Sequence, residues 1–232
     1  MNTFIIQKYI ENPMLINNRK FDIRVWVLVT HELDCFFFRE GYLRTSCKEY
    51  EIDMNNIDDA LVHLTNNAVQ KWAENYGQFE DGNQLSFAQL QDYFDQNMVT
   101  EVTVSELVLQ MKNIIKKTLF SIKRKLNKEN RKYCFEIFGY DFFIDADYNL
   151  WLIEVNTNPC LEESSNLLKM LLPRMIDDAL KITIDTIYPP LKKSYFKDLS
   201  TDLDEEDAGK EKEKGKRKTY PFPGYTDNFN LW

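Results

Sequence analysis

Cysteine and histidine are scarce in this chain of 232 residues. The four cysteines, Cys35, Cys47, Cys134 and Cys160, form no CxxC pair, and only two histidines are present. Structural zinc sites and disulfide frameworks require such residues at close and regular spacing. The composition therefore predicts neither kind of site, and it is typical of a protein from a reducing, cytosolic setting.

Long apolar runs are missing as well. No stretch approaches the roughly 18 consecutive apolar residues of a membrane-spanning helix. The N-terminal MNTFIIQKYIENP has no basic segment followed by a cleavage site. The net charge of -8 disfavours general nucleic-acid binding. We therefore expect a protein that is neither inserted in a membrane nor secreted, and that has no nucleic-acid partner.

Apolar residues are plentiful, with 44% hydrophobic and 14% aromatic residues, so most of the chain should fold around one core. We expect a folded domain over residues 1–190 and a charged, disordered linker over residues 191–219, which have few apolar side chains. Residues 220–232, YPFPGYTDNFNLW, form an aromatic tail. This tail is either floppy or an aromatic anchor that docks on the body or on a partner.

Strand-like and helix-like segments are mixed within residues 1–190, which predicts an α+β fold. Phe4–Ile10, Phe21–Thr30 and Cys35–Leu43 have the composition of strands. Capping boxes at Ser86–Gln89 and Thr103–Glu106 predict a short helix and then a longer one.

Two further helical features follow from the sequence. The short helix should end near Asn97. Leu167–Ile187 has helical composition, but Pro173 lacks a backbone N–H and should kink or divide this segment, with two short helices favoured over one.

Phe135–Glu162, FEIFGYDFFIDADYNLWLIEVNTNPCLE, predicts a β-hairpin. Its arms, Ile137–Ile144 and Leu150–Val155, are rich in aromatic and β-branched residues, and Ala146–Asn149 has the composition of a turn. We therefore expect a loop of these four residues, which sets Asp145 opposite Leu150.

The register of this hairpin decides which side chains share a face. A four-residue loop places Asp141 opposite Glu154, and alternation puts Asn156 on the same side. Two carboxylates so close repel unless one is protonated or a cation lies between them, and an Asp, Glu and Asn set suits Mg²⁺. Alternatively, Asp141 caps a turn and Glu154 faces solvent on an edge strand.

The register set by the four-residue loop also assigns the apolar side chains. It places Phe143 and Leu152 on the polar face, and Phe142, Ile144, Trp151, Ile153 and Val155 on the core face.

A second polar stripe occurs in Arg19–Val29, RKFDIRVWVLV. Lys20, Asp22 and Arg24 alternate with apolar residues, so the three side chains share one face. Two cations around one acid could contact a triphosphate and its ribose, or they could form the solvated rim of a strand. The residues alone leave both interpretations open.

Five segments, taken in order, closely resemble the tubulin–tyrosine ligase and ligase-like family: QKYIENPMLINNRKFDIRVWVLV, FFFREGYLRTS, VHLTNNAVQK, FEIFGYDFFID and WLIEVNTNPCLE. The resemblance covers the chain from about Phe4 to about Pro189. It implies an ATP-grasp-like fold with a mostly antiparallel sheet and flanking helices. It also implies a ligase that uses ATP and Mg²⁺ to add an amino acid to a tubulin tail through an acyl-phosphate.

The resemblance extends to partners and location. The implied partners are tubulin or microtubules and an amino-acid co-substrate, which is tyrosine, glutamate or glycine. The implied location is the cytoplasm and cytoskeleton, including a cilium or basal body.

Individual residues also acquire implied roles. Arg24 and Arg44 match the arginines that hold the reacting carboxylate or acyl-phosphate. The other matched positions are Gln7, Lys8, Tyr9 and Ile10 at the adenine, Lys20 and Asp22 at the nucleotide, Thr65 and Asn66 beside it, and Asp141, Glu154 and Asn156 at the magnesium.

The family's fold begins well before the adenine-contacting segment, whereas this chain begins at it. We therefore expect the N-terminal domain and the first ATP-grasp portion to be lacking. Two functions stay open: the ligase, in a truncated form, and a non-catalytic tubulin- or microtubule-binding module that retains half of a nucleotide site.

Basic residues cluster just before the hairpin, with nine lysines and arginines between Lys112 and Lys132. They either solvate the outer face of an amphipathic helix or guide an acidic tubulin tail towards Arg24 and Arg44.

Overall fold

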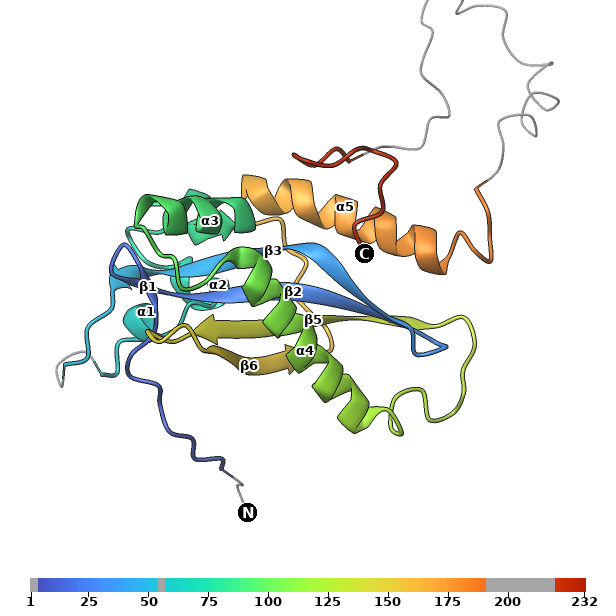
Figure 1. Ribbon diagram of the computed structural model, residues 1–232, viewed down its shortest axis with the longest axis horizontal. Coiled ribbons are helices and arrows are strands. Elements are labelled where there is room, and N and C mark those ends of the chain that lie inside the picture. Colours follow the sequence, from blue (N-terminus) through green and yellow to red (C-terminus); the bar gives the residue numbers. More distant parts are fainter. Residues whose placement is uncertain (1–3, 54–56, 191–219) are drawn as a thin grey trace, which may run out of the picture.

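The computed structural model describes residues 4–53, 57–190 and 220–232 (Figure 1). An antiparallel six-stranded sheet lies at its centre, in the order β4-β3-β2-β5-β6, with β1 paired to β2. The mixed α/β class with an antiparallel sheet is thus confirmed. The elements are β1 (Leu15–Ile16), β2 (Arg19–Thr30), β3 (Cys35–Glu49), α1 (Ala60–His63), α2 (Asn67–Gln70), η1 (Asp81–Asn83), β4 (Gln84–Ser86), α3 (Phe87–Gln96), α4 (Val104–Ile122), β5 (Phe135–Ile144), β6 (Leu150–Asn156) and α5 (Asn166–Thr183).

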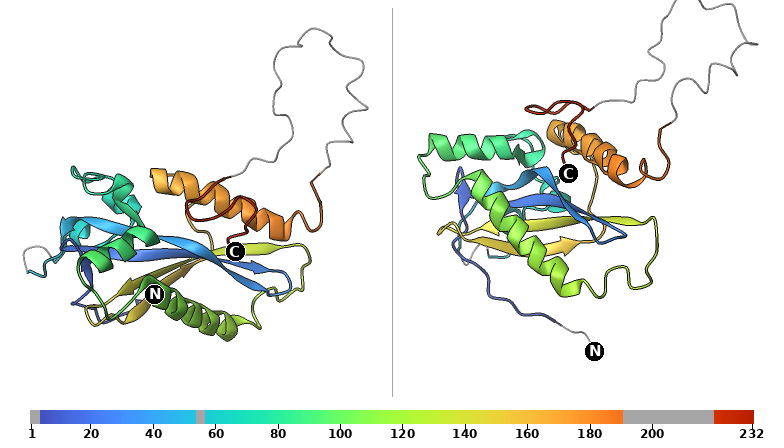
Figure 2. Two further views of the ribbon diagram at one scale, coloured as in Figure 1. Left: turned by 45° about the horizontal axis from the view of Figure 1, so that its top comes forward. Right: turned by 45° about the vertical axis from the view of Figure 1, so that its right-hand side comes forward.

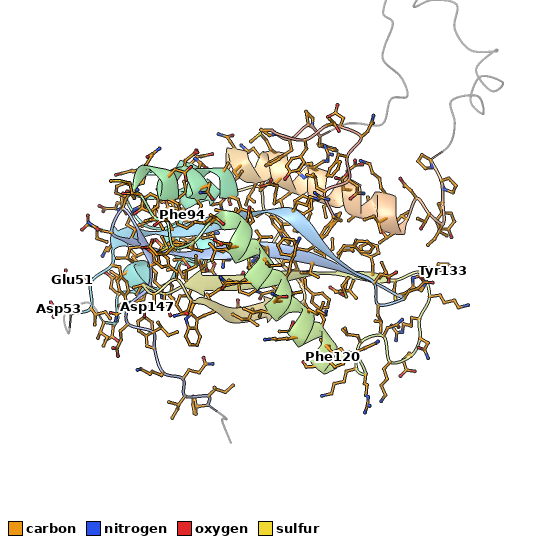
Figure 3. All side chains as sticks on the ribbon, viewed as in Figure 1. Glu51, Asp53, Phe94, Phe120, Tyr133 and Asp147 are labelled. Atoms are coloured by element: carbon orange, nitrogen blue, oxygen red, sulfur yellow. The ribbon has the colours of Figure 1, made fainter. Side chains whose placement is uncertain are left out.

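The central strand β2 separates two environments. Phe21, Ile23 and Val25 are almost fully buried in a core that they share with α3 and α4. Figures 1 and 2 show α4 crossing the sheet diagonally, and Figure 3 labels Phe94 of α3 in the same core. This face of β2 is the apolar one that the alternation predicts.

The opposite face of β2 is divided along its length. At its N-terminal end it carries the polar residues of the second stripe. Further along, Trp26 packs with Tyr42 of β3 and with Leu171 and Met175 of α5 in a second core. The polar part of this face is therefore confined to one end of the sheet.

Local sequence signals set the helices of the first core. Ser86 and Gln89 form the predicted capping box of α3, which ends at Gln96 with Asn97 as its C-cap, and Thr103 and Glu106 form that of α4. Both helices are confirmed. Among the described residues, no helix is long and apolar enough to cross a membrane.

The prediction that Pro173 divides its helix is wrong. One helix, α5, continues through it from Asn166 to Thr183. Leu171 and Leu172 lie before the proline and Met175 after it, and all three are buried in the second core. This packing holds both halves of the helix in line despite the missing backbone donor.

The prediction of a strand at Phe4–Ile10 is also wrong. Phe4, Ile5 and Ile6 are 82–96% exposed, and no described strand pairs with them. Figure 1 shows this segment leading away from the sheet. Strand-like composition produces a strand only where another strand satisfies its backbone.

The hairpin of β5 and β6 deviates twice from the predicted register. Ile144 pairs with Leu150, so the loop has five residues, and the predicted loop of four is wrong. Asp145 closes the longer loop because its carboxylate accepts hydrogen bonds from the backbone N–H of Asn149 (2.8 Å) and the indole N–H of Trp151 (2.8 Å). A bulge at Ile153 then adds one residue to β6.

The two deviations cancel at the acids, and Asp141 pairs with Glu154 as predicted. Between the loop and the bulge, however, the predicted faces are exchanged. Trp151 stacks on Phe143 with ring centroids 6.5 Å apart, and Leu152 packs against the first core. The predicted sides of Trp151 and Leu152 are therefore wrong.

The aromatic tail docks on the body, so the second of the two predicted alternatives holds. Phe222 and Leu231 are buried against α5 and β3, and Figures 1 and 2 show the tail beside α5. The buried guanidinium of Arg174 donates to the carbonyls of Tyr220 (2.9 Å), Thr226 (3.2 Å) and Phe229. The predicted linker at residues 191–219 lies outside the described residues.

Arg174 also donates to Asp178 (2.8 Å), whose carboxylate accepts from the backbone N–H of Leu231 (3.0 Å). Substitution Arg174→Met removes one partner of a buried ion pair and should lower the free energy of unfolding by about 3–5 kcal/mol. Urea unfolding measures this loss, and limited proteolysis should show faster cleavage of the tail. Lys169→Met, at an exposed position of α5, is the control and should change stability by less than about 0.5 kcal/mol. Equal stability of the two variants would contradict the role of Arg174 in holding the tail on α5.

Candidate functional site

A hollow of ≈ 800 Å³ opens where the N-terminal segment and the segment around α1 meet β2, β3, β5 and β6. It brings together eleven of the thirteen predicted site residues. These are Gln7, Lys8, Tyr9, Ile10, Lys20, Asp22, Arg44, Thr65, Asn66, Asp141 and Glu154. The other two, Arg24 and Asn156, bond directly to Asp141. The predicted residues thus form one site, although they come from six separate segments.

Asp141 is the centre of this site and is 3% exposed. Arg24 donates two hydrogen bonds to it, from Nε to Oδ1 and from Nη2 to Oδ2, and the second measures 2.9 Å. Nη2 of Arg44 lies 2.9 Å from the same oxygen, and Nδ2 of Asn156 lies 3.4 Å from it. The carboxylate is therefore surrounded by donors from three other strands.

The strand registers cause this arrangement. Arg24 of β2 pairs with Asp141 of β5, and Asp22 of β2 pairs with Arg44 of β3. Arg44 donates from Nε and Nη2 to Asp22 at 2.7 and 2.6 Å while it also contacts Asp141. Two guanidinium groups and two carboxylates thus compensate one another in a buried cluster. The open choice at the second polar stripe is decided against a solvated rim for Asp22 and Arg24, which are buried.

Asp141, Arg24 and Arg44 of this cluster have pKa values shifted in favour of their charged forms. Burial alone would raise the pKa of Asp141, but the hydrogen bond from Arg24 and the charge of Arg44 hold that pKa below its usual value. Burial alone would lower the pKa of both arginines, and their carboxylate partners raise it above the ordinary value. Neither arginine can therefore serve as a general base.

Glu154 and Asn156 extend the cluster to the surface. Glu154 is exposed, and its Oε1 accepts a hydrogen bond from Nδ2 of Asn156 at 3.1 Å. The amide N–H of Asn156 therefore faces both acids, and a rotation of this amide would present its oxygen instead.

The prediction that Asp141 caps a turn does not hold, because Asp141 lies within β5.

These residues fit a magnesium ion that keeps several waters. Mg²⁺ in nucleotide sites is held by one or two carboxylates and by phosphate oxygens. Glu154 and Asp141 would supply the carboxylates, and Asn156 would supply an amide oxygen. No group of three or more His, Cys, Asp or Glu residues with metal-site geometry occurs among the described residues.

Lys20 marks the other end of the hollow. Its Nζ donates to the hydroxyl of Tyr9 (3.0 Å) and the carbonyl of His63 (3.0 Å), and it lies 4.9 Å from the centre of the Tyr9 ring. Among the described residues, no carboxylate forms an ion pair with Lys20. Its charge is thus available to an anionic ligand.

Thr65 and Asn66 lie nearby. Thr65 is buried, and the side chain of Asn66 caps α2 by accepting a hydrogen bond from the N–H of Ala68 at 2.8 Å.

Sequence reasoning missed Gly139, which makes room for this cluster. A Cβ at this position would lie 2.8 Å from Cβ of Pro159 and 3.3 Å from Nη1 of Arg24. Gly139 pairs with Asn156, so it lies beside the predicted metal ligands. A single glycine inside an aromatic strand was the signal, because such a glycine marks a close approach of other groups.

Comparison with known proteins decides the family. The family model described as Tubulin-tyrosine ligase family matches residues 1–194. The chain belongs to this family. It is 41% identical over 198 residues to Tubulin glycylase 3D of Tetrahymena thermophila, covering 83% of this chain and 19% of that protein.

Two further relatives have similar identity. Tubulin glycylase 3B of Tetrahymena thermophila is 36% identical over 200 residues, which cover 85% of this chain and 16% of that protein. Probable tubulin polyglutamylase TTLL9 of Bos taurus is 38% identical over 184 residues, which cover 78% of this chain and 39% of that protein. The chain therefore spans between 16% and 39% of the length of these relatives.

Substitution Asp141→Asn tests the buried cluster through its pH dependence. The variant leaves the buried guanidinium of Arg24 without a charged partner, removes one of the two acids beside Arg44, and should lose about 3–5 kcal/mol of stability near neutral pH. Because the folded-state pKa of Asp141 is depressed, its contribution is complete above the ordinary value of 3.8 and fades as the pH falls below it.

Urea unfolding from about pH 7 to about pH 3 should therefore show the two stability curves converging in acid. Asp147→Asn, at the exposed tip of the hairpin that Figure 3 labels, is the control and should follow the unsubstituted protein. A difference between Asp141→Asn and the unsubstituted protein that stays constant with pH would contradict the role assigned to the ionised carboxylate.

Proposed function

We propose that this chain carries the catalytic part of an ATP- and Mg²⁺-dependent ligase that adds an amino acid to tubulin tails through an acyl-phosphate, in an ATP-grasp-like fold. The observation that carries the proposal is the buried pair of arginines around Asp141 at the wall of the hollow. Membership of the tubulin–tyrosine ligase family and the names of the relatives support the same reaction class. Its partners would be tubulin or microtubules and tyrosine, glutamate or glycine, in the cytoplasm, on the cytoskeleton or at a cilium or basal body.

The nucleotide would lie along the hollow. Gln7, Lys8, Tyr9 and Ile10 would offer backbone groups to the edge of the adenine, and Thr65 and Asn66 would lie beside the nucleotide. The ammonium group of Lys20 would turn from the Tyr9 hydroxyl and the His63 carbonyl to the phosphates, and Asp22 would face the ribose or phosphates. This orientation directs the triphosphate towards the acidic end of the hollow.

The acidic end would bind the metal and the reacting groups. Asp141, Glu154 and Asn156 would hold Mg²⁺, which neutralises part of the triphosphate charge when it is bound. Phosphorylation of a carboxylate brings two anions together, and Arg24 and Arg44 would reduce that repulsion. Their guanidinium groups are held in place before the substrate arrives, so they can also stabilise the oxyanion that forms when the amine attacks the acyl-phosphate.

Binding of a fluorescent ATP analogue, with and without Mg²⁺, tests the site first. The affinity of the unsubstituted chain should increase with Mg²⁺, and Glu154→Gln should reduce that metal-dependent gain by about tenfold or more. Glu163→Gln changes an exposed acid outside the hollow and should leave the affinity within about twofold. A Mg²⁺ effect of full size in Glu154→Gln would remove Glu154 from the metal site.

Transfer of radiolabelled tyrosine, glutamate or glycine to tubulin then tests the reaction. ATP-dependent incorporation of at least one of them is the expected result when the chain is fused to the N-terminal portion of a family member, and Glu154→Gln should abolish it in that fusion. Nucleotide binding without transfer of any of the three would instead support the non-catalytic tubulin- or microtubule-binding module.

A further inference from the structure

A second hollow, of ≈ 690 Å³, lies between the β2–β3 hairpin and the C-terminal half of α4. Its floor is apolar and includes Val27, Phe37, Leu119 and Leu126. Its rim is basic: Arg39, Lys112, Lys116 and Lys123 line it, and no Asp or Glu does so among the described residues. We call this hollow the basic groove.

The basic groove is separate from the candidate nucleotide site. Val27 and Leu119 belong to the core on the face of β2 that carries Ile23 and Val25, whereas Arg24 points to the opposite face. Three of the nine basic residues of the segment, Lys112, Lys116 and Lys123, line this groove on the other face of the sheet. Guidance of an acidic peptide towards Arg24 and Arg44 stays a prediction.

The rim lysines are free to meet an anionic partner. Lys112, Lys116 and Lys123 form no ion pair with a described carboxylate. Nζ of Lys112 lies 5.1 Å from the centre of the Phe37 ring, so an aromatic side chain rather than an acid supports it. The chain as a whole has a charge of -8, which makes this basic rim a local exception.

Apolar surface continues from the floor to the edge of the groove. Phe120 is 77% exposed and lines the groove, and Figure 3 labels it at the C-terminal end of α4. An exposed aromatic beside an apolar hollow suits the entry of a bulky side chain. The net charge of -8 disfavours a nucleic acid, and a concave apolar floor lined by four cations fits one bulky side chain of an acidic segment better than it fits a flat lipid surface.

We propose that the basic groove binds an acidic peptide segment of a partner protein, with one bulky apolar side chain of that segment seated on the floor. The rim lysines attract the carboxylates on either side of the seated residue. This docking surface goes beyond the proposed ligase site and does not depend on it. It would capture an acidic chain on the face of the sheet opposite the nucleotide.

Fluorescence anisotropy with a synthetic peptide of six glutamates around one phenylalanine tests the charge requirement. The double variant Lys116→Glu and Lys123→Glu should weaken binding by about tenfold or more at low salt, and the difference should shrink at about 300 mM NaCl. The matched control, Lys117→Glu and Lys128→Glu, makes the same charge change on exposed residues outside the groove and should have less than about a third of that effect. Equal weakening by both pairs would show general electrostatic attraction and overturn the proposal.

A second arm tests the apolar seat. Replacing the phenylalanine of the peptide by serine, or Phe120→Ser in the protein, should weaken binding several-fold, whereas Leu109→Ser, at another exposed position of α4, should not. Circular dichroism and thermal unfolding verify that each variant is folded. Binding of the serine peptide as tightly as the phenylalanine peptide would overturn the proposal, as would tighter binding of an oligonucleotide or of anionic vesicles.

Discussion

The mutual compensation of four buried charges is the constraint on which this structure depends. Asp22, Arg24, Arg44 and Asp141 are each at most 8% exposed, and each alone would strongly destabilise the fold. They are tolerated because β2 lies between β3 and β5 in one register, which aligns each guanidinium with a carboxylate. A slip of one residue in either pairing would move a charge into the apolar core. The same register that stabilises the sheet therefore assembles the candidate site.

The two faces of the sheet are covered to different extents. One face is closed by α3 and α4 over a continuous apolar core, and the other is closed by α5 and the tail over only part of its length. The uncovered part carries the charged cluster and opens into the hollow. The cations at this end differ in their partners. Arg24 and Arg44 are held by carboxylates, whereas the partners of Lys20 among the described residues are the Tyr9 hydroxyl and the His63 carbonyl. This difference is what a nucleotide site needs, because fixed charges orient the reacting groups and an available charge binds the phosphates.

Much of this could be predicted from the sequence, because the information is local or strictly periodic. Alternation in β2 assigned Asp22 and Arg24 to one face, and capping boxes located α3 and α4. The ordered motifs identified the family, and the residues carried over from it converge on one hollow.

The errors share a different cause, which is that long-range contacts override local preference. Pro173 stays within one helix because buried leucines and Met175 hold both halves. Phe4–Ile10 has the composition of a strand, but no described strand pairs with it. The hairpin register depended on the Asp145 loop and the Ile153 bulge, two irregularities that composition does not show, and their cancellation preserved the pairing of Asp141 with Glu154.

The most direct test of the central claim is an experimental structure of the chain with Mg²⁺ and a non-hydrolysable ATP analogue. We predict a metal at about 2.1 Å from oxygens of Glu154 and Asp141, with the Asn156 amide rotated towards it. Arg24 should still be bonded to Asp141, and Lys20 should have turned from Tyr9 to a phosphate. A nucleotide bound outside the hollow, or a metal held without Glu154 and Asp141, would contradict the account.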